Sequence, residues 1–142
     1  MKFIEDKTLV RVRFSESDAM GVVWHGNYLK YFEDGRESLG DKFKMNYVDV
    51  YKKGFVTPVV KIDVNYKSPI FFGEDIEIRT RFIKTRAAKL IHHYEVWNLT
   101  TNMLSCTGTS EQVFLNDSQR TLELFYPSFF KEWLDGLNWT EE

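Results

Sequence analysis

Hydrophobic and polar residues follow one spacing in the first third of the chain and another after it. Apolar and basic residues alternate near the start, which predicts a strand from Leu9 to Phe14. From Asn27 onward, apolar residues recur every three or four positions, which predicts an amphipathic helix with Asn27 as its N-cap. We expect Gly40 to interrupt this helix, and a short second helical turn to follow at Val48 to Lys53.

Beyond residue 59 the period becomes two, which is typical of strands with one buried face. The pattern predicts four long strands in an antiparallel meander, at residues 60–67, 76–82, 90–99 and 104–115. One long helix followed by such strands indicates an α+β fold in which the sheet wraps against the helix. Residues 127–137 read as a short C-terminal helix with Pro127 at its first position, packed on this domain or on a partner subunit.

Length and charge narrow the classes of protein. The 142 residues fit one domain, 1–142, and a net charge of −2 without a Lys/Arg block argues against a nucleic-acid partner. The polar start resembles no signal peptide, and no stretch is long and apolar enough for a membrane span. A single cysteine, Cys106, cannot form an internal disulfide and fits a reducing compartment, so we expect a cytoplasmic protein.

Several common catalytic patterns are missing from the sequence. It contains no Gly-x-Ser-x-Gly, no phosphate-binding loop ending in Gly-Lys-Ser/Thr, and no His-Glu-x-x-His. His92 and His93 are adjacent on a predicted strand and therefore point to opposite faces, so we expect no metal site there. Cys106 lies within an apolar strand, which favours a packed thiol over a nucleophile.

Asp18 is the strongest candidate for a catalytic group. Its carboxylate, with a reference pKa of about 3.9, is ionised at neutral pH and could serve as a nucleophile or as a base on water. The backbone N–H groups of His25 and Gly26 would lie near the helix start, where they could polarise a carbonyl. One carboxylate and one helix N-terminus suit a thioester, because a thiol of pKa about 8.5 leaves with little help.

Structural roles are open alternatives for the same residues. An aspartate before a Gly-containing loop commonly forms a cap or an Asx-turn, and this applies to Asp18. The His25 side chain could hydrogen-bond the substrate or orient the loop. Glu16 is expected to be solvated, and Tyr28, Tyr31 and Phe32 are expected in the core.

The segment from residue 13 to residue 36 resembles the signature of the hotdog-fold acyl-CoA thioesterases of the 4-hydroxybenzoyl-CoA thioesterase and YbgC type. The matching residues are Asp18, Gly21, Val22, Val23, His25, Asn27, Tyr28, Tyr31, Phe32, Glu33 and Arg36. The resemblance implies a curved antiparallel sheet around a central helix, and dimers or dimers of dimers with active sites at the subunit interface. It also implies that Asp18 is the catalytic carboxylate and that the backbone around His25 and Gly26 polarises the thioester carbonyl.

The same resemblance places CoA-phosphate contacts at a basic turn that contains Lys84, Arg86 and Lys89. A solvated basic turn without a ligand is the alternative. The sequence therefore predicts an acyl-CoA thioesterase that uses no metal or organic cofactor. The alternatives are a thioesterase acting on an acyl carrier protein, a non-catalytic acyl-CoA-binding protein, and a partner-binding protein that uses its aromatic tail.

Overall fold

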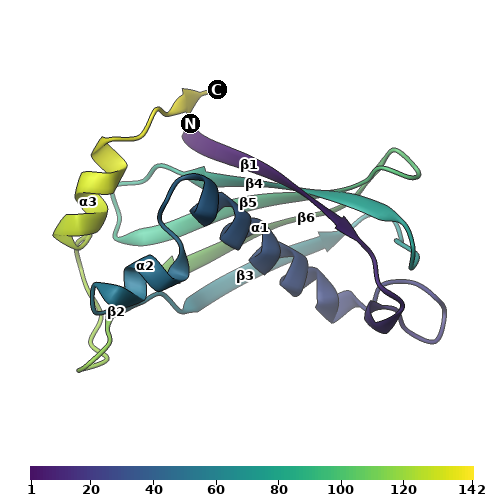
Figure 1. Ribbon diagram of the computed structural model, residues 1–142, viewed down its shortest axis with the longest axis horizontal. Helices are drawn as coiled ribbons and strands as arrows, with labels where there is room; N and C mark the ends of the chain where they lie inside the picture. The colour runs from purple at the N-terminus through teal and green to yellow at the C-terminus, as the bar shows by residue number, and fades with distance from the viewer.

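A curved, six-stranded antiparallel sheet wraps around one long helix in the computed structural model, which describes residues 1–142 (Figure 1). The strands, in their order across the sheet, are β3 (Val59–Tyr66), β6 (Met103–Val113), β5 (Lys89–Asn98), β4 (Asp75–Ile83), β1 (Lys2–Arg11) and β8 (Thr140–Glu141). The remaining elements are α1 (Tyr28–Lys42), α2 (Tyr47–Lys52), α3 (Ser128–Asp135), and a small two-stranded sheet of β2 (Phe55–Val56) and β7 (Leu115–Asn116). The predicted α+β hotdog fold is confirmed.

The apolar stripe of α1 lies directly on the sheet. Tyr31 and Phe32 are fully buried, and the Phe32 ring stacks on Tyr94 of β5 with centroids 4.2 Å apart. Gly35 permits this close approach, because a Cβ at that position would lie 2.2 Å from Oγ1 of Thr80. The expected core role of the helix aromatics is therefore confirmed, and the helix is fixed against β4 and β5.

The C-terminal segment packs on its own chain. Phe130 of α3 is 2 % exposed, and the indole of Trp133 donates a hydrogen bond to the carbonyl of Phe43 at 2.8 Å. The predicted helix is correct in kind but shorter than 127–137, since Pro127 precedes its first residue and the helix stops before Gly136. None of the helices is both long and apolar enough to cross a membrane.

The first strand differs from its prediction. β1 covers Lys2–Arg11 instead of Leu9 to Phe14. It pairs with β4 along this length, from Phe3 opposite Ile83 to Arg11 opposite Asp75. Phe14 begins a short 3₁₀ turn that ends at Glu16. The alternation of residues 9–14 indicated only the last three residues of the strand, 9–11.

The predicted meander is also wrong in one connection. β4, β5 and β6 do follow one another as neighbours, but β3 pairs with β6 at the edge of the sheet and not with β4. The connection after β3 carries the chain across the sheet, and its first two N–H groups, of Lys67 and Ser68, donate to the carbonyl of Ser105. β1 takes the position beside β4 that the meander would have given to β3.

Two predictions for α1 differ from the structure, one for Gly40 and one for Asn27. Gly40 does not interrupt α1, which continues to Lys42. Gly40 is instead a packing position, because a Cβ there would lie 2.9 Å from the carbonyl oxygen of Met45. Asn27 does occupy the N-cap position of α1, but its backbone is already helical and its side chain makes no cap hydrogen bond.

Candidate active site

A tight hairpin between β1 and α1 carries Asp18. Ser17 and Val23 face each other in an antiparallel bridge, and the N–H of Asp18 donates to the carbonyl of Val22 at 2.8 Å. Gly21 closes the hairpin with φ of +81°, a backbone conformation that glycine adopts without strain. The hairpin therefore places Asp18 opposite the residues that lead into α1.

The carboxylate of Asp18 has one occupied and one free oxygen. Its Oδ1 accepts a hydrogen bond of 2.8 Å from the N–H of Met20, so the predicted Asx-turn is confirmed. Oδ2 has no hydrogen-bond partner within the chain, and the residue is only partly buried. One oxygen shapes the loop, and the other is available to a ligand.

The entry to α1 presents two unpaired donors. Residues His25–Asn27 form a 3₁₀ turn immediately before α1, and the N–H groups of its first two residues donate no hydrogen bond within the chain. The ring of Trp24 lies over Gly26, where a Cβ would come within 2.1 Å of the indole. A glycine at this position therefore leaves room for the ring.

Glu16 connects the hairpin to the start of α1. Its backbone carbonyl accepts hydrogen bonds from the N–H of Trp24 at 2.9 Å and from the side-chain amide of Asn27 at 2.7 Å. Its carboxylate accepts from the N–H of Arg13 at 2.8 Å and from the hydroxyl of Tyr31 at 3.3 Å. The expectation of a solvated Glu16 is wrong, because these four bonds make it the structural centre of the loop.

The imidazole of His25 is exposed and makes no hydrogen bond within the chain. Its ring lies beside Trp24, with centroids 4.8 Å apart. The backbone carbonyl of His25, in contrast, accepts a hydrogen bond of 2.8 Å from the hydroxyl of Tyr66 on β3. The side chain is thus free to meet a ligand, while the main chain of the turn is held from another element.

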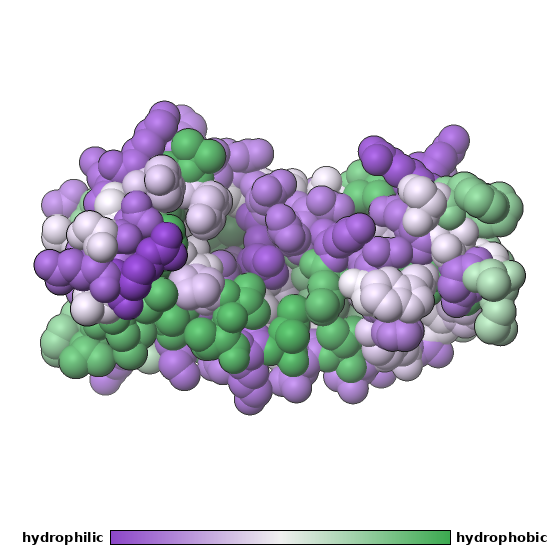
Figure 2. Space-filling view, turned by 90° about the horizontal axis from the view of Figure 1, so that it is seen from below, coloured by the Kyte–Doolittle hydropathy of each residue, from purple (hydrophilic) through white to green (hydrophobic).

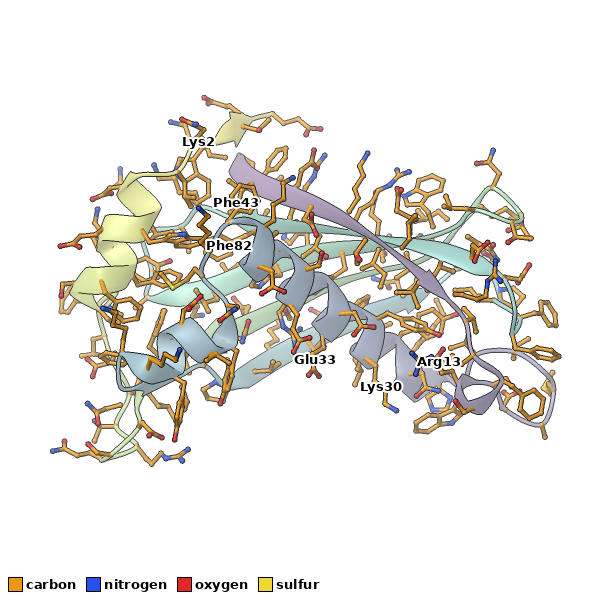
Figure 3. All side chains as sticks on the ribbon, in the orientation of Figure 1. Lys2, Arg13, Lys30, Glu33, Phe43 and Phe82 are labelled. Carbon is orange, nitrogen blue, oxygen red and sulfur yellow. The ribbon has the colours of Figure 1, made fainter.

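The predicted phosphate-binding turn lies at the opposite end of the sheet from Asp18. It follows β4, whose nine residues span about 27 Å, and β4 begins beside the end of β1 that leads to Asp18. In Figure 3 two labelled residues mark the two ends of the molecule: Arg13 lies beside the start of α1, and Phe82 lies near α3. Within one chain Asp18, His25 and Gly26 therefore lie at the same end of the sheet, and the basic turn lies at the other.

The three cations of that turn have different surroundings. The ammonium of Lys84 lies 5.4 Å from the centroid of the Trp139 indole, and that of Lys89 lies 3.6 Å from a carboxylate oxygen of Glu111. Arg86 is exposed and forms no ion pair within the chain. Arg86 is consequently the cation with the most freedom to meet an external anion.

The sequence model of the thioesterase-like superfamily matches residues 12–134, which extend from the end of β1 into α3. The chain belongs to the thioesterase-like superfamily. The prediction of a thioester hydrolase is therefore confirmed at the level of the family.

Individual relatives agree with this membership. The proposed acyl-CoA thioesterase YneP of Bacillus subtilis is 32% identical over 127 residues, which are 89% of this chain and 91% of that protein. The acyl-CoA thioesterase YbgC of Helicobacter pylori is 34% identical over 88 residues, 61% of this chain and 63% of YbgC. The crystal structure of the DHNA-CoA thioesterase from Staphylococcus aureus superposes with a TM-score of 0.84 at 30% identity, covering 92% of this chain and 87% of that one.

This superfamily member also contains a cavity of about 360 Å³ beside α1. Hydrophobic side chains make up about half of its lining, and charged residues of α1 contribute as well. The lining residues are Glu33, Arg36, Glu37, Leu39, Gly40, Met45, Asn46, Tyr47, Val50, Thr57, Val59, Phe82, Leu90, His92, Gln112, Phe130 and Trp133. They come from elements spread over the whole chain, so no local sequence pattern could have indicated this cavity.

His92 is the buried titratable group of the cavity. Burial lowers its pKa to about 3, so the imidazole is neutral at neutral pH, and its Nδ1 has no hydrogen-bond partner within the chain. The adjacent His93 lines a separate, polar depression formed by the sheet and the C-terminal residue Glu142, as expected for neighbours on a strand. Burial likewise raises the pKa of the Cys106 thiol to about 12, which agrees with a packed thiol.

Proposed function

We propose that this thioesterase-superfamily member hydrolyses acyl-CoA thioesters with Asp18 as its catalytic carboxylate. The observation that carries the proposal is the free Oδ2 of Asp18 in a hairpin that leads directly into two unpaired N–H groups. The names of the relatives YneP and YbgC point to the same substrate class.

The reaction needs two actions from these residues. The N–H groups of His25 and Gly26 donate to the thioester oxygen, and each such donor is typically worth about 2.7–4 kcal/mol at the transition state. Asp18 either attacks the carbonyl carbon itself or removes a proton from the attacking water. In both routes the C–S bond breaks, CoA leaves as a thiolate that takes up a proton, and water supplies the oxygen of the acid.

A second copy of the chain completes the assembly in this proposal, as a dimer or a dimer of dimers. β3 is an edge strand of eight residues, and its outer backbone groups are unpaired. Val59 and Val60 on this strand are 42 % and 57 % exposed. Figure 2 looks onto this edge and shows a hydrophobic band along it, the kind of surface that a partner strand covers.

We further assign the cavity beside α1 to the acyl group of a substrate that reacts at Asp18 of the other copy, because Phe82 and Phe130 of its lining lie at the end of the sheet opposite to Asp18 of the same chain. Its volume of about 360 Å³ lies at the lower end of the range for small-molecule sites, roughly 300–1,000 Å³, and about half of its lining is hydrophobic. The buried, unpaired Cys106 fits the reducing compartment in which CoA esters are handled, so we place the enzyme in the cytoplasm.

The proposed function is tested by the release of free CoA thiol from short, medium, long and aryl acyl-CoAs. We expect turnover on at least one member of the panel, and the preferred member reports the shape of the acyl cavity. Binding without turnover on every member would overturn the proposal in favour of an acyl-CoA-binding protein. Turnover only on thioesters of an acyl carrier protein would mean that this protein, and not CoA, carries the acyl group.

The basic turn of one copy serves the active site of the other copy in this proposal, because the whole length of β4, about 27 Å, lies between it and the end of β1 that leads to Asp18 in the same chain. We expect Arg86→Ala to raise the KM for acyl-CoA several-fold and to leave kcat unchanged, since it removes a phosphate contact and no reacting group. Steady-state kinetics at two salt concentrations check this, and exposed Lys52→Ala on α2 is the matched control.

Mixed dimers identify which site the turn serves. One copy carries Asp18→Asn and the other carries Arg86→Ala, so only the second copy has an intact carboxylate. A turn that acts across the interface gives this site a wild-type KM. A raised KM in the mixed dimer would mean that each turn serves the active site of its own chain. An unchanged KM in the dimer with Arg86→Ala in both copies would mean that the turn serves neither site.

A further inference from the structure

Tyr66 connects the last position of β3 to the entry of α1. Its hydroxyl donates to the backbone carbonyl of His25 at 2.8 Å, across 41 residues of sequence. Its ring meets the Tyr28 ring edge-on, with centroids 5.1 Å apart. The position of Tyr66 is itself fixed, because the next two N–H groups, of Lys67 and Ser68, both donate to the carbonyl of Ser105 on β6.

The carbonyl that Tyr66 contacts belongs to the same peptide group as the N–H of Gly26. A trans peptide is planar, so its C=O and N–H point in opposite directions and turn together. A donor on the oxygen therefore fixes the direction of the N–H, and it also polarises the group so that the N–H becomes a stronger donor. The other face of Gly26 is covered by Trp24, which leaves the peptide little freedom to rotate.

We propose that Tyr66 is a positioning residue that aims and polarises the Gly26 N–H toward the thioester oxygen. This inference rests on the proposed function, which gives that N–H its role. A purely packing role explains less, because Tyr66 is 52 % exposed and its hydroxyl nevertheless reaches a backbone carbonyl of the catalytic turn. Tyr66 also lies on β3, the edge strand proposed to receive a second copy. The same residue therefore belongs to the proposed subunit interface and orients the Gly26 N–H.

The test replaces only the hydroxyl. In Tyr66→Phe we expect kcat to fall roughly tenfold, short of the 10²–10³-fold loss of a whole oxyanion donor, while KM stays within about twofold. Tyr126→Phe is the matched control, because the Tyr126 hydroxyl also donates to a backbone carbonyl at 2.8 Å, that of Lys89. The control should have a wild-type kcat, and an equal fall of kcat in both variants would overturn the proposal.

An NMR measurement gives a readout that does not depend on turnover. We expect the Gly26 amide proton to shift upfield in Tyr66→Phe, because its peptide loses the polarising donor, and to be unmoved in Tyr126→Phe. An unchanged Gly26 resonance would overturn the proposal even if activity fell. If the wild type hydrolysed no thioester and the resonance still moved, the proposed function would fail, and with it the oxyanion role, while the link from Tyr66 to the Gly26 peptide would stand.

Discussion

Asp18→Asn is expected to lower kcat for the preferred acyl-CoA by a hundredfold or more, the low end for the loss of a general base. The substitution is well suited to this site, because an asparagine oxygen can still accept the hydrogen bond from the N–H of Met20 that shapes the loop. The hairpin should therefore keep its form while the charge and the basicity disappear. Release of CoA thiol by wild type and variant at saturating substrate measures the effect.

Two observations make that result specific. The thermal midpoint of Asp18→Asn should equal that of the wild type, which excludes unfolding as the cause. Asp135→Asn removes an exposed carboxylate of α3 and should leave turnover unchanged. A fall of less than about tenfold in Asp18→Asn would assign the bond-breaking role to another group.

Phe130→Ala is expected to lower the free energy of unfolding by about 3–5 kcal/mol, the usual cost of truncating a buried phenylalanine. Phe130 is 2 % exposed and its ring contacts those of Phe114 and Trp133, with centroids 4.9 and 5.0 Å away. The loss would be a large part of the roughly 5–15 kcal/mol that holds a typical domain folded. Urea unfolding followed by far-UV circular dichroism gives the value.

An exposed phenylalanine shortly before α3 provides the control for this substitution. Phe125 is 82 % exposed, so Phe125→Ala should change the free energy of unfolding by no more than about 0.5 kcal/mol. A cost below about 1 kcal/mol for Phe130→Ala would contradict the packing described for α3. That outcome would favour the alternative in which the aromatic tail binds a partner.

The sequence could indicate which residues face the core but not which strands are neighbours. The spacing of Tyr28, Phe32 and Leu39 predicts the buried stripe of α1 correctly, because that stripe depends only on the helical period. Alternation in β3 likewise indicates a strand. It says nothing about whether the strand lies beside β4 or β6, because either neighbour leaves the same side chains facing the helix.

The candidate site divides in the same way between local and distant parts. Asp18, His25 and Gly26 are eight residues apart at most, so their proximity follows from the chain itself and could be proposed from the sequence. Tyr66 belongs to the same site through one hydrogen bond from a distant strand, and its place in the alternating pattern gave no sign of it. The resemblance to a known family located the basic turn but could not place it relative to Asp18 in one chain.

The strand order also has a consequence for synthesis on the ribosome. β1 is made first, yet its partners β4 and β8 are both made later, so it has no strand to pair with until residue 75 and beyond have emerged. At about 5–20 residues per second this interval lasts several seconds. The hairpins of β4, β5 and β6 are the part of the sheet built from consecutive strands, and they provide the template on which the older β1 and β3 dock. The Asp18 hairpin follows directly on β1, so the sheet can hold it only once β4 has been made.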